Sequence, residues 1–193
     1  MASDADLIGR SLDGDVDAFV SVVERHEAAV GSYLARRAGR DAAEDLLGEV
    51  WVAAFESRRL YNRSYDDARP WLYGVALNRL RRYWRSRPAE DLAPDVTELA
   101  AGWDPWSAVD LGVDARVVLR AALMRLKPEE REVLRLVAWE DLTAADAART
   151  LGMPAGTARR LLSQARSAGR LGVDRGYGPA GGQVGRGGHG RDG

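Results

Sequence analysis

The segment from Leu142 to Arg166, LTAADAARTLGMPAGTARRLLSQAR, constrains the fold of this 193-residue chain more than any other part of the sequence. Thr143 is a favourable N-cap for a short helix, and Gly152 can take the positive φ that a helix exit often needs. Pro154 then suits the first turn of a second helix, because proline has no N–H to leave unsatisfied there. The spacing therefore predicts two short helices joined by a tight turn.

The second of these helices is predicted to have one apolar and one polar side. Its expected buried residues are Ala158, Leu161, Leu162 and Ala165. Residues 155–172 also contain four arginines and no acid, whereas an ordinary solvated face usually mixes both signs of charge. A face of this kind suits phosphates and base edges, which favours a DNA-binding helix-turn-helix over an ordinary helical hairpin. The candidate DNA contacts are Thr157, Arg159, Arg160, Ser163, Gln164 and Arg166.

The rest of the chain also shows helical spacing of apolar residues, and strand signals are scarce. Further helices are expected over 15–38, 42–56, 70–85 and 114–126, with another starting near Pro128. The pattern predicts an all-α chain of two small helical domains joined by an acidic linker. The expected divisions are a first domain at 1–87, the linker at 88–113, a second domain at 114–172 and a disordered Gly-rich tail at 173–193.

Charge is segregated along the chain although the formal net charge is only −1. Residues 1–57 contain 12 acidic and 5 basic side chains, and residues 58–87 contain 9 arginines and 2 aspartates. Residues 88–114 contain 7 acids and no base, and residues 115–172 contain 11 basic and 6 acidic side chains. This distribution indicates two surfaces for a polyanion, although solvated helix faces remain an alternative on charge alone.

The helix expected at 70–85 interleaves arginines with aromatic residues. Basic side chains can hold phosphates, aromatic faces can stack on unpaired bases, and asparagine can pair with a base edge. Opening a duplex needs this combination, because bases taken out of the stack must be captured elsewhere. Core packing is an equally good interpretation of Trp71 alone. The candidate contacts are Arg69, Trp71, Tyr73, Asn78, Arg81 and Arg82.

Several classes of function lack sequence support. The chain has no cysteine, and its two histidines are far apart, so neither disulfides nor a histidine-cluster metal site is expected. No phosphate-binding glycine loop or Gly-x-Ser-x-Gly motif is present, so we expect neither an enzyme nor a cofactor. No apolar run approaches the roughly 20 residues of a membrane span, and the acidic N-terminus does not resemble a signal peptide. A cytoplasmic protein is expected.

Two parts of the chain resemble the bacterial sigma-70-type transcription factors, in the small extracytoplasmic-function (ECF) subgroup. The C-terminal resemblance spans 115–171 and lies in Leu126–Leu134, Leu142-Thr143, Ala147-Ala148, Leu151-Gly152 and Gly156-Thr157. The N-terminal resemblance lies in Asp15–Phe19, Ala43–Trp51 and Arg69–Asn78. Gly48 and Arg82 depart from the family pattern, as does Leu161, which stands where an arginine is frequent.

The resemblance implies a sigma factor that binds core RNA polymerase and directs initiation at specific promoters. The helix-turn-helix would read the −35 element, and residues 69–78 would recognise and melt the −10 element. Asp45, Glu49 and Glu56 form an acidic ridge by their spacing of four and seven, which alone would indicate only a solvated helix face. The resemblance implies that this ridge binds the clamp helices of the largest polymerase subunit. The candidate polymerase contacts are Asp45, Leu46, Glu49 and Val50.

Two further expectations concern partners. An anti-sigma protein is expected by analogy with the family. A free-standing helix-turn-helix regulator that binds an operator without polymerase remains the alternative, but it would leave the acidic ridge and the Arg-aromatic helix unexplained.

Overall fold

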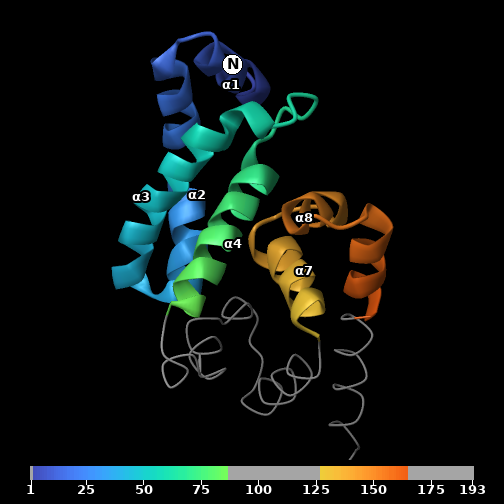
Figure 1. The fold of residues 1–193 in the computed structure, drawn as a ribbon. Helices are drawn as coiled ribbons and strands as arrows, with labels where there is room; N and C mark the ends of the chain where they lie inside the picture. The colour runs from blue at the N-terminus through green and yellow to red at the C-terminus, as the bar shows by residue number, and fades with distance from the viewer. Residues whose placement is uncertain (1, 87–126, 165–193) are drawn as a thin grey trace, which may run out of the picture.

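The computed structural model describes residues 2–86 and 127–164, and every regular element in these two ranges is helical (Figure 1). The elements of the first range are α1 (Asp4–Leu12), α2 (Val16–Ala38), α3 (Arg40–Ser57), the 3-10 helix η1 (Arg58–Leu60) and α4 (Arg69–Arg85). Those of the second are α7 (Pro128–Trp139), α8 (Ala144–Leu151) and a helix over 155–164. The all-α expectation is confirmed. The predicted linker, the helix at 114–126 and the tail lie outside the described residues.

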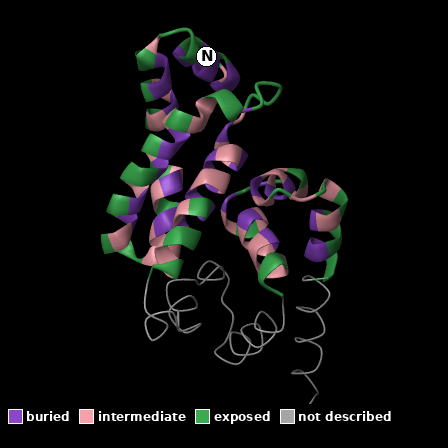
Figure 2. Cartoon of the chain, in the orientation of Figure 1, coloured by how far each residue is buried: buried purple, intermediate pink, exposed green. Residues whose placement is uncertain are grey.

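The N-terminal domain (residues 2–86) is built on α2, α3 and α4, with α1 packed across one end (Figure 1). Apolar residues of the long helices turn inward, as the buried stripes in Figure 2 show. Leu34, Val50 and Leu72 are completely buried at its centre. The aromatic rings of Phe19 and Phe55 meet edge to face, 5.2 Å apart, and tie α2 to α3.

Helix α1 is absent from the sequence-based expectation. It starts with a capping box, in which the Ser3 hydroxyl accepts from the Asp6 amide and the Asp6 carboxylate accepts from the Ser3 amide, both at 3.1 Å. A helix of nine residues is marginal by itself in water. It is held here because Leu7 and Ile8 are buried against the rest of the domain. Its weak local signal is therefore supplemented by tertiary packing.

The C-terminal domain (residues 127–164) has the predicted helix-turn-helix. Thr143 caps α8, and Gly152 ends it in the left-handed region at φ 65°. The second helix packs back across α7 and α8. The small core consists of Val133, Ala148, Ala158, Leu161 and Leu162. The predicted buried stripe is confirmed for all its members within the described residues, and Ala165 lies beyond them.

Candidate nucleic-acid interface

The outer side of helix 155–164 carries most of the predicted DNA contacts in the C-terminal domain. We call it the reading face, and it is formed by Arg159, Arg160, Ser163 and Gln164. All four residues are exposed, while Leu161 on the opposite side is buried. Thr157, also predicted to contact DNA, is half-buried near the start of the helix. Arg166 lies outside the described residues. The burial of Leu161 gives a physical reason for an apolar residue where the family often has arginine.

A groove lies between α3 and α4, and we call it the strand groove, for a DNA strand. It is lined by Arg59, Leu60, Asn78, Arg79 and Arg82 together with α3 residues. Asn78 and Arg82, two of the predicted −10 contacts, are one helical turn apart on α4, and both line this groove. Leu60 is 77 % exposed at the rim. Neither Arg59 nor Arg82 has a carboxylate within ion-pair distance in the part of the chain that the structure describes. The groove therefore combines basic, amide and apolar surface with one acidic side chain, that of Glu56.

The remaining candidates on α4 face elsewhere. Arg81 lines a groove between the two domains. Arg69 pairs with Asp67 at 2.8 Å, and Trp71 packs its ring 5.2 Å from that of Tyr61. Tyr73 is buried and its ring lies 4.9 Å from that of Tyr33, so in this arrangement it contributes to packing and is closed to a base. The six predicted residues thus do not form one surface.

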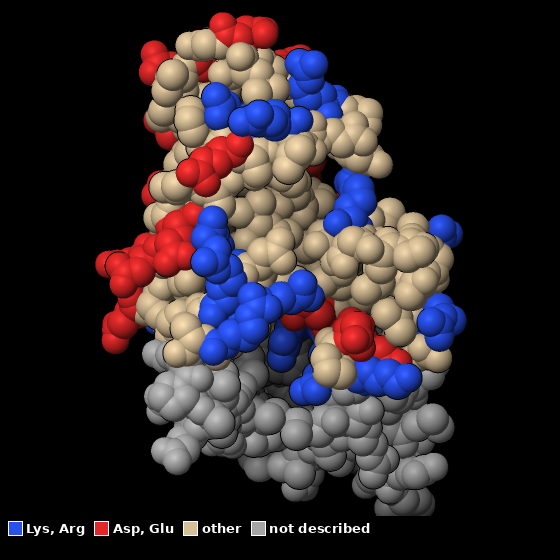
Figure 3. Space-filling model, viewed as in Figure 1, with Lys and Arg blue, Asp and Glu red and all other residues tan. Residues whose placement is uncertain are grey.

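Basic and acidic surfaces meet along α3 and α4. Figure 3 shows acidic side chains along the α3 edge of the molecule and basic side chains gathered over the lower half of α4. Asp45, Glu49 and Glu56 of the acidic ridge are exposed, whereas Leu46 and Val50 are buried in the core. The two apolar residues were interpreted as partner contacts, but in this structure they hold α3 in place. Val52, which is 59 % exposed, supplies the apolar surface within the ridge.

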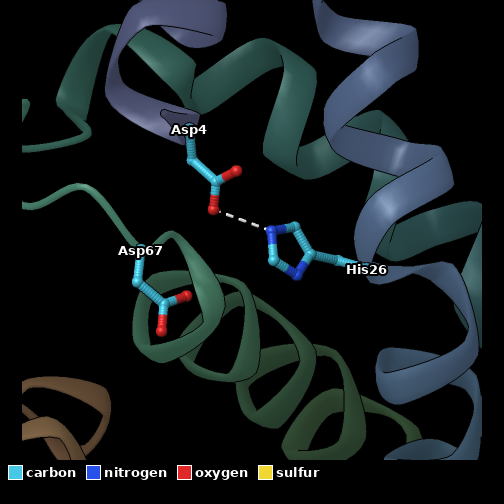
Figure 4. Close-up of side chains that lie close together, drawn as sticks. All are labelled: Asp4, His26 and Asp67. Atoms are coloured by element: carbon cyan, nitrogen blue, oxygen red, sulfur yellow. Dashed lines mark hydrogen bonds and ion pairs between the residues drawn. The ribbon is translucent and has the colours of Figure 1, made fainter. Parts of the chain in front are cut away.

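A buried polar network supports the segment that enters α4. Figure 4 shows Asp4 reaching from the start of α1 towards His26 on α2, with Asp67 beside them. The Asp4 carboxylate lies 2.7 Å from His26 Nε2, accepts the Ala68 amide at 2.8 Å and pairs with Arg25. Asp4 therefore ties α1 and α2 to the first turn of α4, where the predicted −10 contacts begin.

The charge of Asp4 is stabilised despite its burial. Burial raises the pKa of its carboxyl, but hydrogen bonds from His26 and Ala68 and the charges of His26 and Arg25 outweigh this effect and lower the pKa. The ligand atoms of Asp4, His26 and Asp67 lie within 4.8 Å of one another, which is close enough to surround a cation. A cation would have to displace the Arg25 guanidinium and the Ala68 amide, so we interpret the cluster as a structural network.

Charged side chains also join the two domains. Arg37 on α2 is 4 % exposed and lies 2.9 Å from Glu132 and 3.5 Å from Glu140 of the C-terminal domain. Arg36 pairs with Glu140 at 2.7 Å. Burial raises the pKa of Glu132, but the neighbouring charges of Arg37 and Arg135 outweigh it and lower the pKa. Glu132 is therefore held as a carboxylate at the interface.

Helix α8 lies directly across α4. The Thr150 hydroxyl donates to the Pro70 carbonyl at 2.9 Å, and a Cβ on Gly74 would lie 3.3 Å from the Thr150 carbonyl oxygen. The Arg149 guanidinium lies 3.6 Å above the ring of Tyr65, in the segment before α4. Gly74 thus permits a close helix crossing that a larger residue would obstruct.

These interdomain residues were not anticipated. Arg37, Tyr65 and Arg149 were not singled out because no local motif marks them and their partners are 84 or more positions away along the chain. The clearest available signal was Gly74, a glycine inside an otherwise regular helix.

Comparison with known protein families agrees with the N-terminal and the C-terminal domain described above. The sigma-70 region 2 family matches residues 22–95, and the sigma-70 region 4 family matches residues 116–168. The ECF RNA polymerase sigma factor SigM of Mycobacterium tuberculosis (strain H37Rv) is 30 % identical over 174 residues, covering 86 % of this chain and 82 % of that protein. The ECF RNA polymerase sigma-E factor of Haemophilus influenzae is 27 % identical over 177 residues, covering 85 % and 92 %.

Solved structures show the same fold. CnrH, in complex with the cytosolic domain of CnrY, superposes with a TM-score of 0.60 at 24 % identity, covering 89 % of this chain and 97 % of that chain. RpoE of Bartonella quintana, in complex with the anti-sigma factor NepR, gives a TM-score of 0.53 at 18 % identity, covering 81 % and 96 %. Among the described helices, none combines the length and the apolar character of a bilayer span.

The order of the two matched regions, the relatives that cover most of the chain, and the helix-turn-helix agree with one another. The chain belongs to the ECF subgroup of the sigma-70 family, the RNA polymerase sigma factors that direct transcription from specific promoters.

Proposed function

We propose that three separate surfaces divide the work of this sigma factor. The acidic ridge on α3 binds the clamp helices of the largest polymerase subunit. The strand groove captures the opened −10 region, and the reading face recognises the −35 element in the major groove. The observation that carries the proposal is the separation of exposed acidic and basic surfaces on adjacent helices α3 and α4.

Polymerase binding is supported by the composition of the ridge. Asp45 and Glu49 are exposed on one side of α3, with Val52 one turn further on. An apolar centre with charged neighbours is typical of a specific protein interface. Glu49 also lies 3.8 Å from Arg79 of the strand groove. Polymerase that contacts the ridge would therefore be placed close to melted DNA.

Strand capture is supported by the chemistry of the groove. Arg59 and Arg82 can hold phosphates, Asn78 can pair with a base edge, and the apolar rim at Leu60 can contact a base face. The −35 role is supported by the reading face, where Arg160 and Gln164 stand one turn apart on an exposed helix. A bidentate contact from either residue would discriminate between bases by about 1–3 kcal/mol.

The expected partners follow from this division: core polymerase, promoter DNA and an anti-sigma protein. The structural relative RpoE of Bartonella quintana is seen with the anti-sigma factor NepR, which supports a partner of that class here. We place the protein in the cytoplasm, where polymerase and the chromosome are found. Its role is regulatory, as in the sigma factor family, and the proposed surfaces require no catalytic group.

Run-off transcription with reconstituted enzyme tests the proposal. Core polymerase with this chain should initiate at a cognate promoter, while the chain alone should bind that duplex weakly. The alternative, a free-standing regulator, predicts tight operator binding without polymerase and no initiation with it. That pair of results would overturn the proposal.

A further inference from the structure

We propose that the groove between the two domains, which we call the interdomain groove, is a binding site for a nucleoside diphosphate. It lies between α4 and α7 and has a volume of about 370 Å³, which is within the range of small-ligand pockets. Its lining residues belong neither to the reading face nor to the strand groove. The site therefore adds a ligand beyond polymerase and DNA, and it stands or falls independently of the promoter function proposed above.

The two walls of the groove are built by one side of each helix. On α4, Leu77, Arg81 and Trp84 follow one another at spacings of four and three, so they share a side. On α7, Arg131 and Arg135 are one turn apart and line the facing wall. Figure 3 shows basic side chains, together with acidic ones, around the hollow between these helices. The groove thus brings guanidinium groups from distant segments of the chain to one space.

Positive charge is in excess in this groove. Four arginines and two glutamates line it in the described part of the chain. Glu132 is already shared, because it lies 2.9 Å from Arg37 and 3.3 Å from Arg135. Within residues 2–86 and 127–164, neither Arg81 nor Arg131 has a carboxylate within ion-pair distance. Two guanidinium groups are therefore left to hold an anion.

Unused hydrogen-bond donors also support an anionic ligand. The Nε atoms of Arg37 and Arg131 are buried and have no hydrogen-bond partner among the described residues. A buried donor without an acceptor is unfavourable, whereas phosphate oxygens accept strongly from guanidinium groups. Burial and the charges of Arg37 and Arg131 lower the pKa of Arg135, and the charge of Glu132 offsets them only in part. An anion in the groove would relieve this crowding of positive charge.

The apolar part of the groove selects the class of ligand. Leu77 and Trp84 on α4, and Leu151 and Met153 in the C-terminal domain, supply this apolar surface. An aromatic side chain can stack on a nucleobase, and each of two guanidinium groups can hold one phosphate in a forked contact. An acidic peptide would use the arginines but leave the apolar surface without a partner. A nucleoside diphosphate uses both.

Isothermal titration calorimetry of the full chain with ADP tests this proposal. Adenosine and inorganic pyrophosphate supply the two halves of the ligand separately, and tetraglutamate represents an acidic peptide. The anion variant is Arg81→Gln with Arg131→Gln, and Arg81→Lys with Arg131→Lys keeps the charge but removes the fork. The ring variants are Trp84→Leu and Trp84→Phe. The matched control is Arg82→Gln, since Arg82 is next to Arg81 on α4 but lines the strand groove.

The parent chain should bind ADP at one site, and adenosine and pyrophosphate about tenfold or more weakly. The anion variant should weaken ADP binding about a hundredfold, or about tenfold for each guanidinium group, with the lysine variant between it and the parent. Trp84→Leu should weaken binding about tenfold, while Trp84→Phe, which keeps an aromatic ring, should stay close to the parent. The control Arg82→Gln should match the parent.

Several results would overturn the site. These are no ADP binding by the parent chain, ADP binding that survives the anion variant, or a loss confined to Arg82→Gln, which would place ADP in the strand groove. Tetraglutamate bound as tightly as ADP would assign the groove to an acidic peptide instead. Circular dichroism shows whether each variant is folded. Arg81 is exposed, so Arg81→Gln alone tests the site where the double variant unfolds.

Discussion

The two domains present their recognition residues in different ways. In the C-terminal domain one amphipathic helix carries the reading face outward and the core residues inward. In the N-terminal domain the predicted contacts on α4 are spread over the strand groove, the interdomain groove and the core. A duplex can be read by a rigid helix, whereas strand capture needs a site assembled from several segments.

The largest expected effect is on core polymerase binding, which we assign to the N-terminal domain. Asp45→Arg with Glu49→Arg places positive charge on the ridge and should weaken binding of core polymerase about a thousandfold, because wrong charges at an interface cost several kcal/mol. Fluorescence anisotropy with labelled core polymerase measures this loss. Duplex binding by the C-terminal domain should be unchanged. Normal polymerase affinity in this variant would remove the ridge from the proposed interface.

The next effect is on the stability of the N-terminal domain. Asp4→Asn leaves Arg25 and His26 without their carboxylate and should lower the free energy of unfolding by about 3 kcal/mol. Urea unfolding followed by circular dichroism measures it. Asp17→Asn, an exposed aspartate on α2, is the control. An Asp4 variant as stable as the parent would show that the network does not hold the entry to α4.

The same variant has a defined pH dependence. The folded pKa of Asp4 is lower than its ordinary value of 3.8, so its contribution to stability is complete well above pH 3.8 and is lost as the pH falls through the folded pKa. The stability difference between the parent and the variant should thus be constant near neutral pH and shrink in acid. A difference that grows below pH 3.8 would contradict this assignment.

A smaller effect belongs to the reading face. Arg160→Ala or Gln164→Ala should cost about 2 kcal/mol at one −35 base pair and relax preference there, because a bidentate contact is lost. Competition between promoter variants for reconstituted holoenzyme measures the preference. Binding of core polymerase should stay at the parent level. Uniform loss of affinity over all −35 sequences would instead assign these residues to phosphate contacts.

The smallest effect concerns a contact that joins the two domains. Arg149→Ala removes the cation–π contact with Tyr65 and should lower the free energy of unfolding by about 1 kcal/mol, the scale of such a contact. Urea unfolding followed by circular dichroism measures this loss. Arg10→Ala, which removes a surface ion pair with Asp15, is the matched control. Equal stability of the two variants would exclude a contribution of the Arg149–Tyr65 contact to the folded chain.

Local sequence signals were sufficient for the helices that are capped and amphipathic. Thr143, Gly152 and the Leu161 stripe specify the helix-turn-helix within a few residues of chain, and the structure has all three. Helix α1 was missed because its nine residues depend on burial against distant parts of the chain. Its Ser3–Asp6 capping box was the available signal.

The candidate DNA and polymerase contacts could likewise be predicted only in part from the sequence. The exposure of Asn78 and Arg82 follows from helical spacing, but the burial of Tyr73 depends on the approach of α2 and of the C-terminal domain. Leu46 and Val50 were assigned to a partner although their apolar side faces the core. Spacing identifies the side of a helix, while only the packing of other helices determines what covers it.

Selection of promoters by reconstituted holoenzyme tests the division of labour most directly. A randomised promoter library should yield two sequence boxes for the parent chain. Gln164→Ala should alter only the upstream box, and Asn78→Ala only the downstream box. A single box, or the same box altered by both substitutions, would contradict the assignment of the two elements to the two domains.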